Sequence, residues 1–183
     1  MKTKYILIPA IVLFLFSLTL WMLQFRAGDE LLKRYGISEL TLREKIAYLE
    51  NSVDDREKVT AGVTGTSLIV TLEGKEFQFR LPTDEFYLSV APYIDQTHPC
   101  GIHSLVTCKG ELTDTAFDVT VVDENDTVIL SGTYTSYANG FIGVWLPKNK
   151  TLRITVTYQG LSATSLVTTN LTSNTCLTTL RLS

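Results

Sequence analysis

The hydrophobic pattern of the chain begins with one long apolar run. Residues 5–25 carry no charged side chain, and they follow the basic residues Lys2 and Lys4. A helix of this length, at about 1.5 Å per residue, matches a bilayer core of roughly 30 Å. The run lacks a small-x-small cleavage site at its end, which favours an uncleaved signal anchor over residues 1–28 rather than a cleaved signal peptide. In either case the chain from Asp29 onward is expected outside the cytoplasm.

The pattern after the apolar run is helical. Asp29 is a candidate N-cap for a short helix that Gly36 would end. A second helix is expected from about Ser38, where Thr41 and Glu44 have the spacing of a capping box. Its apolar positions recur on one face, at Leu42, Ile46, Leu49 and Val53. The charged residues 54–58 then predict a solvated break.

From Ser67 the period changes from helical to alternating, which indicates β-strands. A hairpin is expected around Glu73, Gly74 and Lys75. The predicted strands cover residues 67–72, 76–80, 86–91, 116–122, 128–134, 141–146, 152–158 and 162–168. Short strands at this spacing predict a small antiparallel β-sandwich. The fold class is therefore α+β, with an anchor over 1–28, an N-terminal α+β region over 29–97 and a β-rich region over 98–183.

Charge and motifs exclude several classes of function. The net charge is −3 and the chain has no basic run, so nucleic acid is not an expected partner. No phosphate-binding glycine loop is present. Ser104 directly follows His103, and adjacent residues of a strand point apart, so these two do not form a nucleophile–base pair. The sequence favours a binding protein over an enzyme.

The candidate chemistry is concentrated in residues 98–108. This segment holds both histidines, His98 and His103, and two of the three cysteines, Cys100 and Cys108; the third is Cys176. Thiolate and imidazole donors suit Cu(I), zinc and iron–sulfur chemistry. Three thiolates satisfy Cu(I), while zinc would take Cys100, His103, Cys108 and Cys176 as four tetrahedral ligands. Either ion requires Cys176 to fold back onto the loop that carries Cys100 and Cys108.

Two interpretations without a bound metal compete with the interpretation of these residues as a Cu(I) or zinc site. Three cysteines outside the cytoplasm are typical of one disulfide and a spare thiol, and Cys100 with Cys108 would staple a loop in a structural or interaction module. A thiol–disulfide oxidoreductase is a second alternative, although no Cys-x-x-Cys motif begins a helix. Metal binding and disulfide chemistry are also compatible, because a thiol pair that closes to a disulfide supplies two electrons for reducing Cu(II) to Cu(I).

Several motifs resemble one known family. Residues 84–98 read DEFYLSVAPYIDQTH, and Cys100, His103-Ser104-Leu105 and Cys108-x-Gly110-Glu111 follow them. The tail TCLTTL at 175–180, the segments NGF at 139–141 and WLP at 145–147, and the early Leu32-x-x-Tyr35-Gly36 belong to the same pattern. Together they resemble the CueP family, over nearly the whole chain beyond the anchor.

The resemblance implies an extracytoplasmic copper-binding protein for copper resistance or homeostasis, with reduction of Cu(II) and delivery of copper to a periplasmic superoxide dismutase as associated properties. It implies a two-part protomer whose N-terminal region can form a homodimer. Carried over residue by residue, the family's three cysteines fall on Cys100, Cys108 and Cys176, and its motif histidine on His103; His98 lies in a matching triplet. The anchor further predicts a protein tethered at the outer face of the cell membrane, or a periplasmic or secreted one if the signal is cleaved.

Overall fold

The computed structural model describes residues 4–52 and 58–183, except for the side chains of residues 4–11 and 20–25. Most of the predicted charged break, together with Val53, therefore lies outside the described residues, as do residues 1–3 of the predicted anchor. The chain divides into two compact units, Met1–Leu40 and Thr41–Ser183. The site described below lies wholly within the second unit.

The first unit contains one long helix, α1 (Lys4–Arg34). The prediction of a separate helix beginning at Asp29 is wrong, because no proline lies between Pro9 and Asp29 and the helix continues through. Its end is as predicted: Gly36 has a φ of 70°, and the amides of Gly36 and Ile37 donate to the carbonyls of Lys33 and Leu32. Over the described part of the chain, no helix combines the length and the apolar character needed to cross a membrane.

The second unit opens with α2 (Leu42–Glu50), and its predicted capping box is confirmed. The Thr41 hydroxyl accepts a hydrogen bond from the Glu44 amide, and the Glu44 carboxylate accepts one from the Thr41 amide. These bonds satisfy amides that the first turn of a helix leaves without partners. The buried face of α2 carries Ile46, Leu49 and, at its last position, Glu50.

A four-stranded sheet follows, in the order β3-β2-β1-β5. Its strands are β1 (Val59–Val63), β2 (Ser67–Leu72), β3 (Lys75–Arg80) and β5 (His103–Ser104). The predicted hairpin between β2 and β3 is confirmed, and both of its turn residues, Glu73 and Gly74, have positive φ. The sequence analysis did not predict β1 or the two-residue β5, whose pairing with β1 places His103 opposite Val63.

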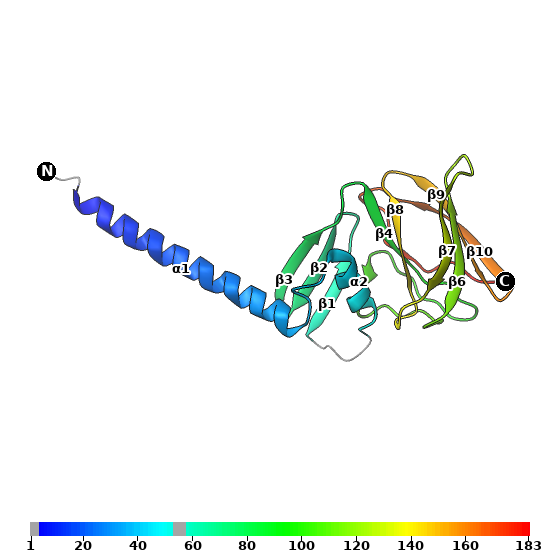
Figure 1. Ribbon diagram of the computed structural model, residues 1–183, viewed down its shortest axis with the longest axis horizontal. Helices are drawn as coiled ribbons and strands as arrows, with labels where there is room; N and C mark the ends of the chain where they lie inside the picture. The colour runs from blue at the N-terminus through cyan, green and yellow to red at the C-terminus, as the bar shows by residue number, and fades with distance from the viewer. Residues whose placement is uncertain (1–3, 53–57) are drawn as a thin grey trace. The chain divides into compact units, whose positions relative to one another are not determined.

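Two further sheets complete the unit (Figure 1). One has the order β10-β9-β6-β7, built from β6 (Ala116–Val122), β7 (Val128–Thr135), β9 (Thr151–Tyr158) and β10 (Leu161–Thr168). The other has the order β11-β4-β8, built from β4 (Glu85–Val90), β8 (Ile142–Pro147) and β11 (Cys176–Leu177). The pairings are antiparallel except that of β11, which runs parallel to β4. The prediction of an α+β protein with antiparallel sheets is confirmed.

The main apolar core lies between these last two sheets. Alternate residues of β4 and β8 meet alternate residues of β6 and β9, and all of them are buried. The largest contributors are Phe86, Leu88, Phe117, Val144, Leu146, Ile154 and Val156. Burying each large apolar side chain stabilises the fold by about 1.5–3 kcal/mol. The strands β4 and β8 are thereby held firmly at the point where they also border the cysteines.

The predicted boundary between an N-terminal α+β region over 29–97 and a β-rich region over 98–183 stays a prediction.

Candidate metal centre

Main-chain hydrogen bonds bring Cys176 to the loop that carries Cys100. The short strand β11 lies parallel to β4, with Cys176 opposite Ser89. The carbonyl of Gly101 accepts hydrogen bonds from the amides of both Thr175 and Cys176, at 3.0 and 3.2 Å. The predicted return of Cys176 to this loop is therefore found, and the loop between β4 and β5 lies against β11.

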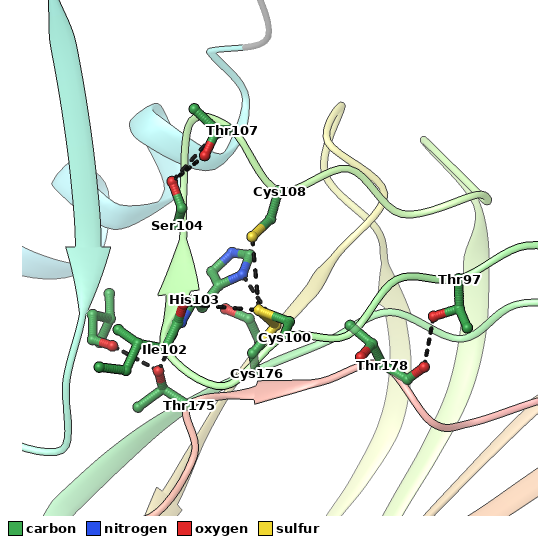
Figure 2. Close-up of a disulfide and its surroundings, with 12 residues drawn as sticks. Thr97, Cys100, Ile102, His103, Ser104, Thr107, Cys108, Thr175, Cys176 and Thr178 are labelled. Atoms are coloured by element: carbon green, nitrogen blue, oxygen red, sulfur yellow. Dashed lines mark hydrogen bonds between the residues drawn. A yellow bond between two sulfur atoms is a disulfide. The ribbon is translucent and has the colours of Figure 1, made fainter.

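Cys100 and Cys176 form a disulfide across 76 positions of sequence, and Cys108 is a free thiol. The alternative in which Cys100 pairs with Cys108 is wrong, because the hydrogen bonds of Gly101 hold β11 directly beside Cys100. Cys108 is nevertheless close, with its Sγ 3.7 Å from the Sγ of Cys100. Figure 2 shows the three cysteines around one point, with Cys108 approaching from the opposite side to Cys176.

His103 is fully buried and faces this point from β5. Its Nδ1 lies 3.6 Å from the Sγ of Cys176, and its Nε2 lies 3.0 Å from Oε2 of Glu50. Its ring packs on Phe141, with centroids 4.3 Å apart. Its amide donates to the hydroxyl of Thr175, tying β5 to β11. The strands β5 and β11 and the ring of Phe141 thus hold the imidazole beside the sulfur atoms.

The resulting cluster has the chemistry of a soft-metal site. The donor atoms of Cys100, His103, Cys108 and Cys176 all lie within 4.8 Å of one another. Three sulfurs and one imidazole nitrogen suit Cu(I) or zinc and are poor ligands for calcium or magnesium. While the disulfide is closed, only Cys108 and His103 are available as donors. Reduction of the disulfide therefore changes the number of thiol groups in the cluster from one to three.

The charges of His103 and Cys108 support each other. Burial lowers the pKa of His103, but hydrogen bonds with Cys108 and Glu50 outweigh burial and raise it to about 9. Burial raises the pKa of Cys108, while contacts with His103 and His98 outweigh burial and lower it to about 7. A thiolate beside an imidazolium is therefore favoured near neutral pH. A thiolate is the form of cysteine that binds metals and attacks disulfides.

His98 lies beside the four clustered donors and is not one of them. Its side chain is half-buried, and its ring meets the edge of Phe141 at a centroid distance of 6.2 Å. Its Nε2 is buried without a hydrogen-bond partner among the described residues. A cavity of about 430 Å³ borders it, lined by Gln96, Thr97, His98, Lys109, Gly110 and Glu111. His98 thus borders this cavity and has one buried ring nitrogen without a hydrogen-bond partner among the described residues.

The sequence analysis missed Glu50, the carboxylate that contacts His103. Glu50 is fully buried, and it also meets Tyr87, Ser89 and Asn139. A signal was present in the sequence: Glu50 follows Ile46 by four positions, so a charged residue continues the apolar face of α2. Charges are rarely buried without a partner, which makes such a position a candidate for a polar contact.

A crossing of two backbones holds the loop after Cys108. The amide of Gly110 donates to the carbonyl of Asn139 at 2.7 Å, and a Cβ on Gly140 would lie only 2.6 Å from the carbonyl oxygen of Gly110. Gly140 also has a φ of 82°. Glycine is therefore required at both positions for this approach. The crossing connects the Cys108 loop to Asn139 and Phe141, which contact Glu50 and His103.

Comparisons with known proteins agree with this fold. A protein-family model, that of the periplasmic copper-binding protein CueP, matches residues 44–181. The crystal structure of S.CueP superposes with a TM-score of 0.79 at 36% sequence identity, and the match covers 85% of this chain and 97% of that one. No curated protein sequence matches the chain significantly. The match with the family model includes every cysteine and histidine of the cluster.

Proposed function

The chain belongs to the CueP family of periplasmic copper-binding proteins, and on this premise we propose that it binds copper outside the cytoplasm as Cu(I). The ligands in this proposal are the thiolates of Cys100, Cys108 and Cys176 and the imidazole of His103, with His98 as an accessory. The observation that carries it is the convergence of four soft donor atoms within 4.8 Å. Cu(I) is satisfied by two or three thiolates, and the apolar side chains of Phe141 and Ala91 pack beside the three cysteines.

A thiol-driven reduction of Cu(II) is the second part of the proposal. The thiols of Cys100 and Cys176 lose two electrons and two protons as their S–S bond forms, and two Cu(II) ions become two Cu(I) ions. Cys108 and His103 then remain to hold one of the product ions, with His98 beside them. The disulfide between Cys100 and Cys176, with Cys108 left free, supports this division of roles. The reaction is stoichiometric until an external thiol reduces the disulfide.

Titration with Cu(I) under anaerobic conditions tests the ligand set. Fully reduced protein competing with a Cu(I) chelator should take up one equivalent of Cu(I), and Cys108→Ser should weaken binding by at least about tenfold, since loss of a ligand costs no less than loss of its supporting contacts. Thr107→Ala, beside Cys108, is the matched control and should bind as the unmodified chain does. Folded, reduced protein that ignores Cu(I), or that retains zinc against excess Cu(I), would contradict the proposal.

A parallel measurement tests the reduction. Reduced protein mixed with Cu(II) should form Cu(I) and lose two thiols for every two Cu(I) ions produced, counted with a Cu(I) chelator and a thiol reagent. Cys100→Ser should abolish formation of the Cys100–Cys176 disulfide. An equal yield of that disulfide with no Cu(I) formed would rule out the coupled reaction.

The location and partners form a further part of the proposal. We propose that the uncharged residues 5–25 tether the protein at the outer face of the cell membrane; Val12, Leu13, Phe14, Leu15 and Phe16 in this segment are all exposed. Recovery of the protein from cells in an alkaline-resistant membrane fraction is expected, and complete release as a shortened chain would contradict the tether. A homodimer and copper transfer to a superoxide dismutase rest on the family resemblance.

A further inference from the structure

Glu50 is a fully buried carboxylate to which the copper proposal assigns no role. It ends α2 and receives hydrogen bonds from three other parts of the second unit. Oε1 accepts from the hydroxyls of Tyr87 and Ser89 on β4, at 2.9 and 3.0 Å. Oε2 contacts Nε2 of His103 on β5 and Nδ2 of Asn139 in the loop before β8. The Glu50 carboxylate therefore acts as a hydrogen-bond acceptor for several parts of the fold.

The orientation of Asn139 is fixed by its other contacts. Its Oδ1 accepts a hydrogen bond from the amide of Phe141 at 3.0 Å, and its Nδ2 also donates to the carbonyl of Leu105 at 3.2 Å. The amide nitrogen must therefore face Glu50, and Oε2 acts as an acceptor toward it. This removes the usual ambiguity between the oxygen and nitrogen of an asparagine side chain.

The same carboxylate oxygen determines which nitrogen of His103 keeps its proton in the neutral ring, the form that binds a metal. The other contacts of this carboxylate are all with hydrogen-bond donors, so Nε2 of His103 is assigned as the donor in its 3.0 Å contact with Oε2. Nδ1 then remains for the sulfur side, where it lies 3.6 Å from Cys176. The Phe141 ring restricts rotation of the imidazole. A histidine that binds metal through one nitrogen commonly donates its other N–H to a carboxylate in this way.

We propose that Glu50 is a positioning residue of the metal centre, which holds the Nε2–H of His103 and so directs Nδ1 to the copper ion. This inference rests on the proposed function. It predicts that the bond between Nε2–H and Glu50 exists before copper arrives, because α2, β4 and the Asn139 loop build it without any metal. The role belongs to the hydrogen-bond acceptor, so a neutral acceptor of the same shape should fill it.

Glu50→Gln and Glu50→Met separate this role from bulk packing. The glutamine side chain can place its oxygen toward His103 and Asn139 and its amide toward the hydroxyls of Tyr87 and Ser89, which can also accept. The methionine side chain has a similar length and offers no oxygen acceptor. Thr41→Ala is the matched control, because it removes the N-cap of α2 and loosens the helix without touching Glu50.

The readout is the imidazole of His103 in ¹⁵N NMR spectra of reduced protein labelled at histidine, before and after one equivalent of Cu(I). The unmodified chain, Glu50→Gln and Thr41→Ala should show a slowly exchanging Nε2–H in the metal-free state, and Cu(I) should shift the Nδ1 resonance. Glu50→Met should lose the slow Nε2–H and bind Cu(I) about 10–100-fold more weakly.

Two results would overturn the inference: loss of the Nε2–H in the unmodified chain when Cu(I) binds, or a Glu50→Met variant that keeps both the slow Nε2–H and full affinity. If Glu50→Met does not fold, the spectra of the unmodified chain and of Glu50→Gln still decide, because both must show the slow Nε2–H. If the unmodified chain binds no Cu(I), the proposed function fails, while the metal-free spectra independently report whether Glu50 holds His103.

Discussion

The protein has two interiors that are built in different ways. The apolar core between the sheets of β4-β8 and β6-β9 consists of side chains that alternate along each strand, and neighbouring pairs are set by strand register. The interior around His103 and Glu50 consists of individual polar contacts between residues far apart in the chain. The apolar core tolerates small changes in side-chain geometry, and its burial contributes a large stabilising free energy. The second interior is small in area and depends on the position of single atoms.

The comparison teaches where stability and chemistry reside. Apolar burial scales with area and changes little when copper or a reductant is added. Contacts of the polar interior contribute about 0.5–1.5 kcal/mol each, but an unmade bond to a buried group costs about 1–3 kcal/mol. Substitutions in the two interiors should therefore differ in their dependence on redox state and in their effect on metal binding.

Phe117→Ala should have the largest effect on stability. Phe117 is 1% exposed in the apolar core, and truncating such a ring lowers the free energy of unfolding by about 3–5 kcal/mol. Denaturant unfolding should show the same loss in oxidised and reduced protein, since the ring does not contact the cysteines. Leu166→Ala, at a side chain that is 71% exposed, should cost less than about 0.5 kcal/mol. Equal losses for the two variants would contradict the assignment of this core.

Removal of the disulfide should have a smaller effect that depends on redox state. Cys108→Ser keeps the bond between Cys100 and Cys176, while Cys100→Ser/Cys108→Ser has none and leaves no second thiol to form another. Under oxidising conditions the double variant should be about 2–4 kcal/mol less stable than Cys108→Ser. With a reductant present the difference should disappear. A difference that persists under reduction would show that the cysteine side chains stabilise by packing.

The smallest effect expected is the pH dependence of Cys108. Its pKa falls from 9.0 to about 7 on folding, so the contribution of its thiolate to stability is complete above 9 and is lost as the pH falls through 7. The pKa of His103 rises from 6.5 to about 9, so its contribution is complete below 6.5 and is lost as the pH rises through 9. The pair formed by the Cys108 thiolate and the His103 imidazolium therefore stabilises the fold mainly between about pH 7 and about pH 9.

The rate of alkylation of oxidised protein measures the pKa of Cys108 directly, because Cys108 is then the free thiol. The rate with iodoacetamide should reach half its maximum near pH 7 in folded protein and near pH 9 in urea, where the environment that lowers the pKa of Cys108 is lost. His103→Gln should move the folded midpoint upward. An unchanged midpoint in that variant would show that His103 does not stabilise the thiolate.

The apolar interior could largely be predicted from sequence, and the polar one only in part. Alternation of apolar residues located most of the strands, and the spacing of Thr41 and Glu44 located the start of α2. Both signals are local: they are read within a few neighbouring positions. The strand β1 was not predicted, because Val59–Val63 is short and contains an internal glycine, so that its alternation of apolar and polar residues is weak.

The four clustered residues were named as candidate ligands from their rarity and chemical type, which needs no geometry. The disulfide partner of Cys100 was not identified, because the choice between Cys108 and Cys176 depends on where β11 docks. Glu50 was missed for a related reason. Its contacts with Tyr87 and Asn139 span 37 and 89 positions, and no local pattern encodes contacts of that range. Long-range polar contacts follow from the assembled sheets and not from the period of any one element.

The parallel docking of β11 on β4 has a consequence for biogenesis. Between Cys108 and Cys176 the chain forms five strands, β6 to β10. Closing so long a loop is slow, and its ends meet in the native arrangement once the intervening sheets have formed. A nascent or misfolded chain then presents scattered thiols in place of a complete cage for the ion. On the proposed function, an ion that requires all three sulfur atoms would therefore bind the finished tertiary structure and not its precursors.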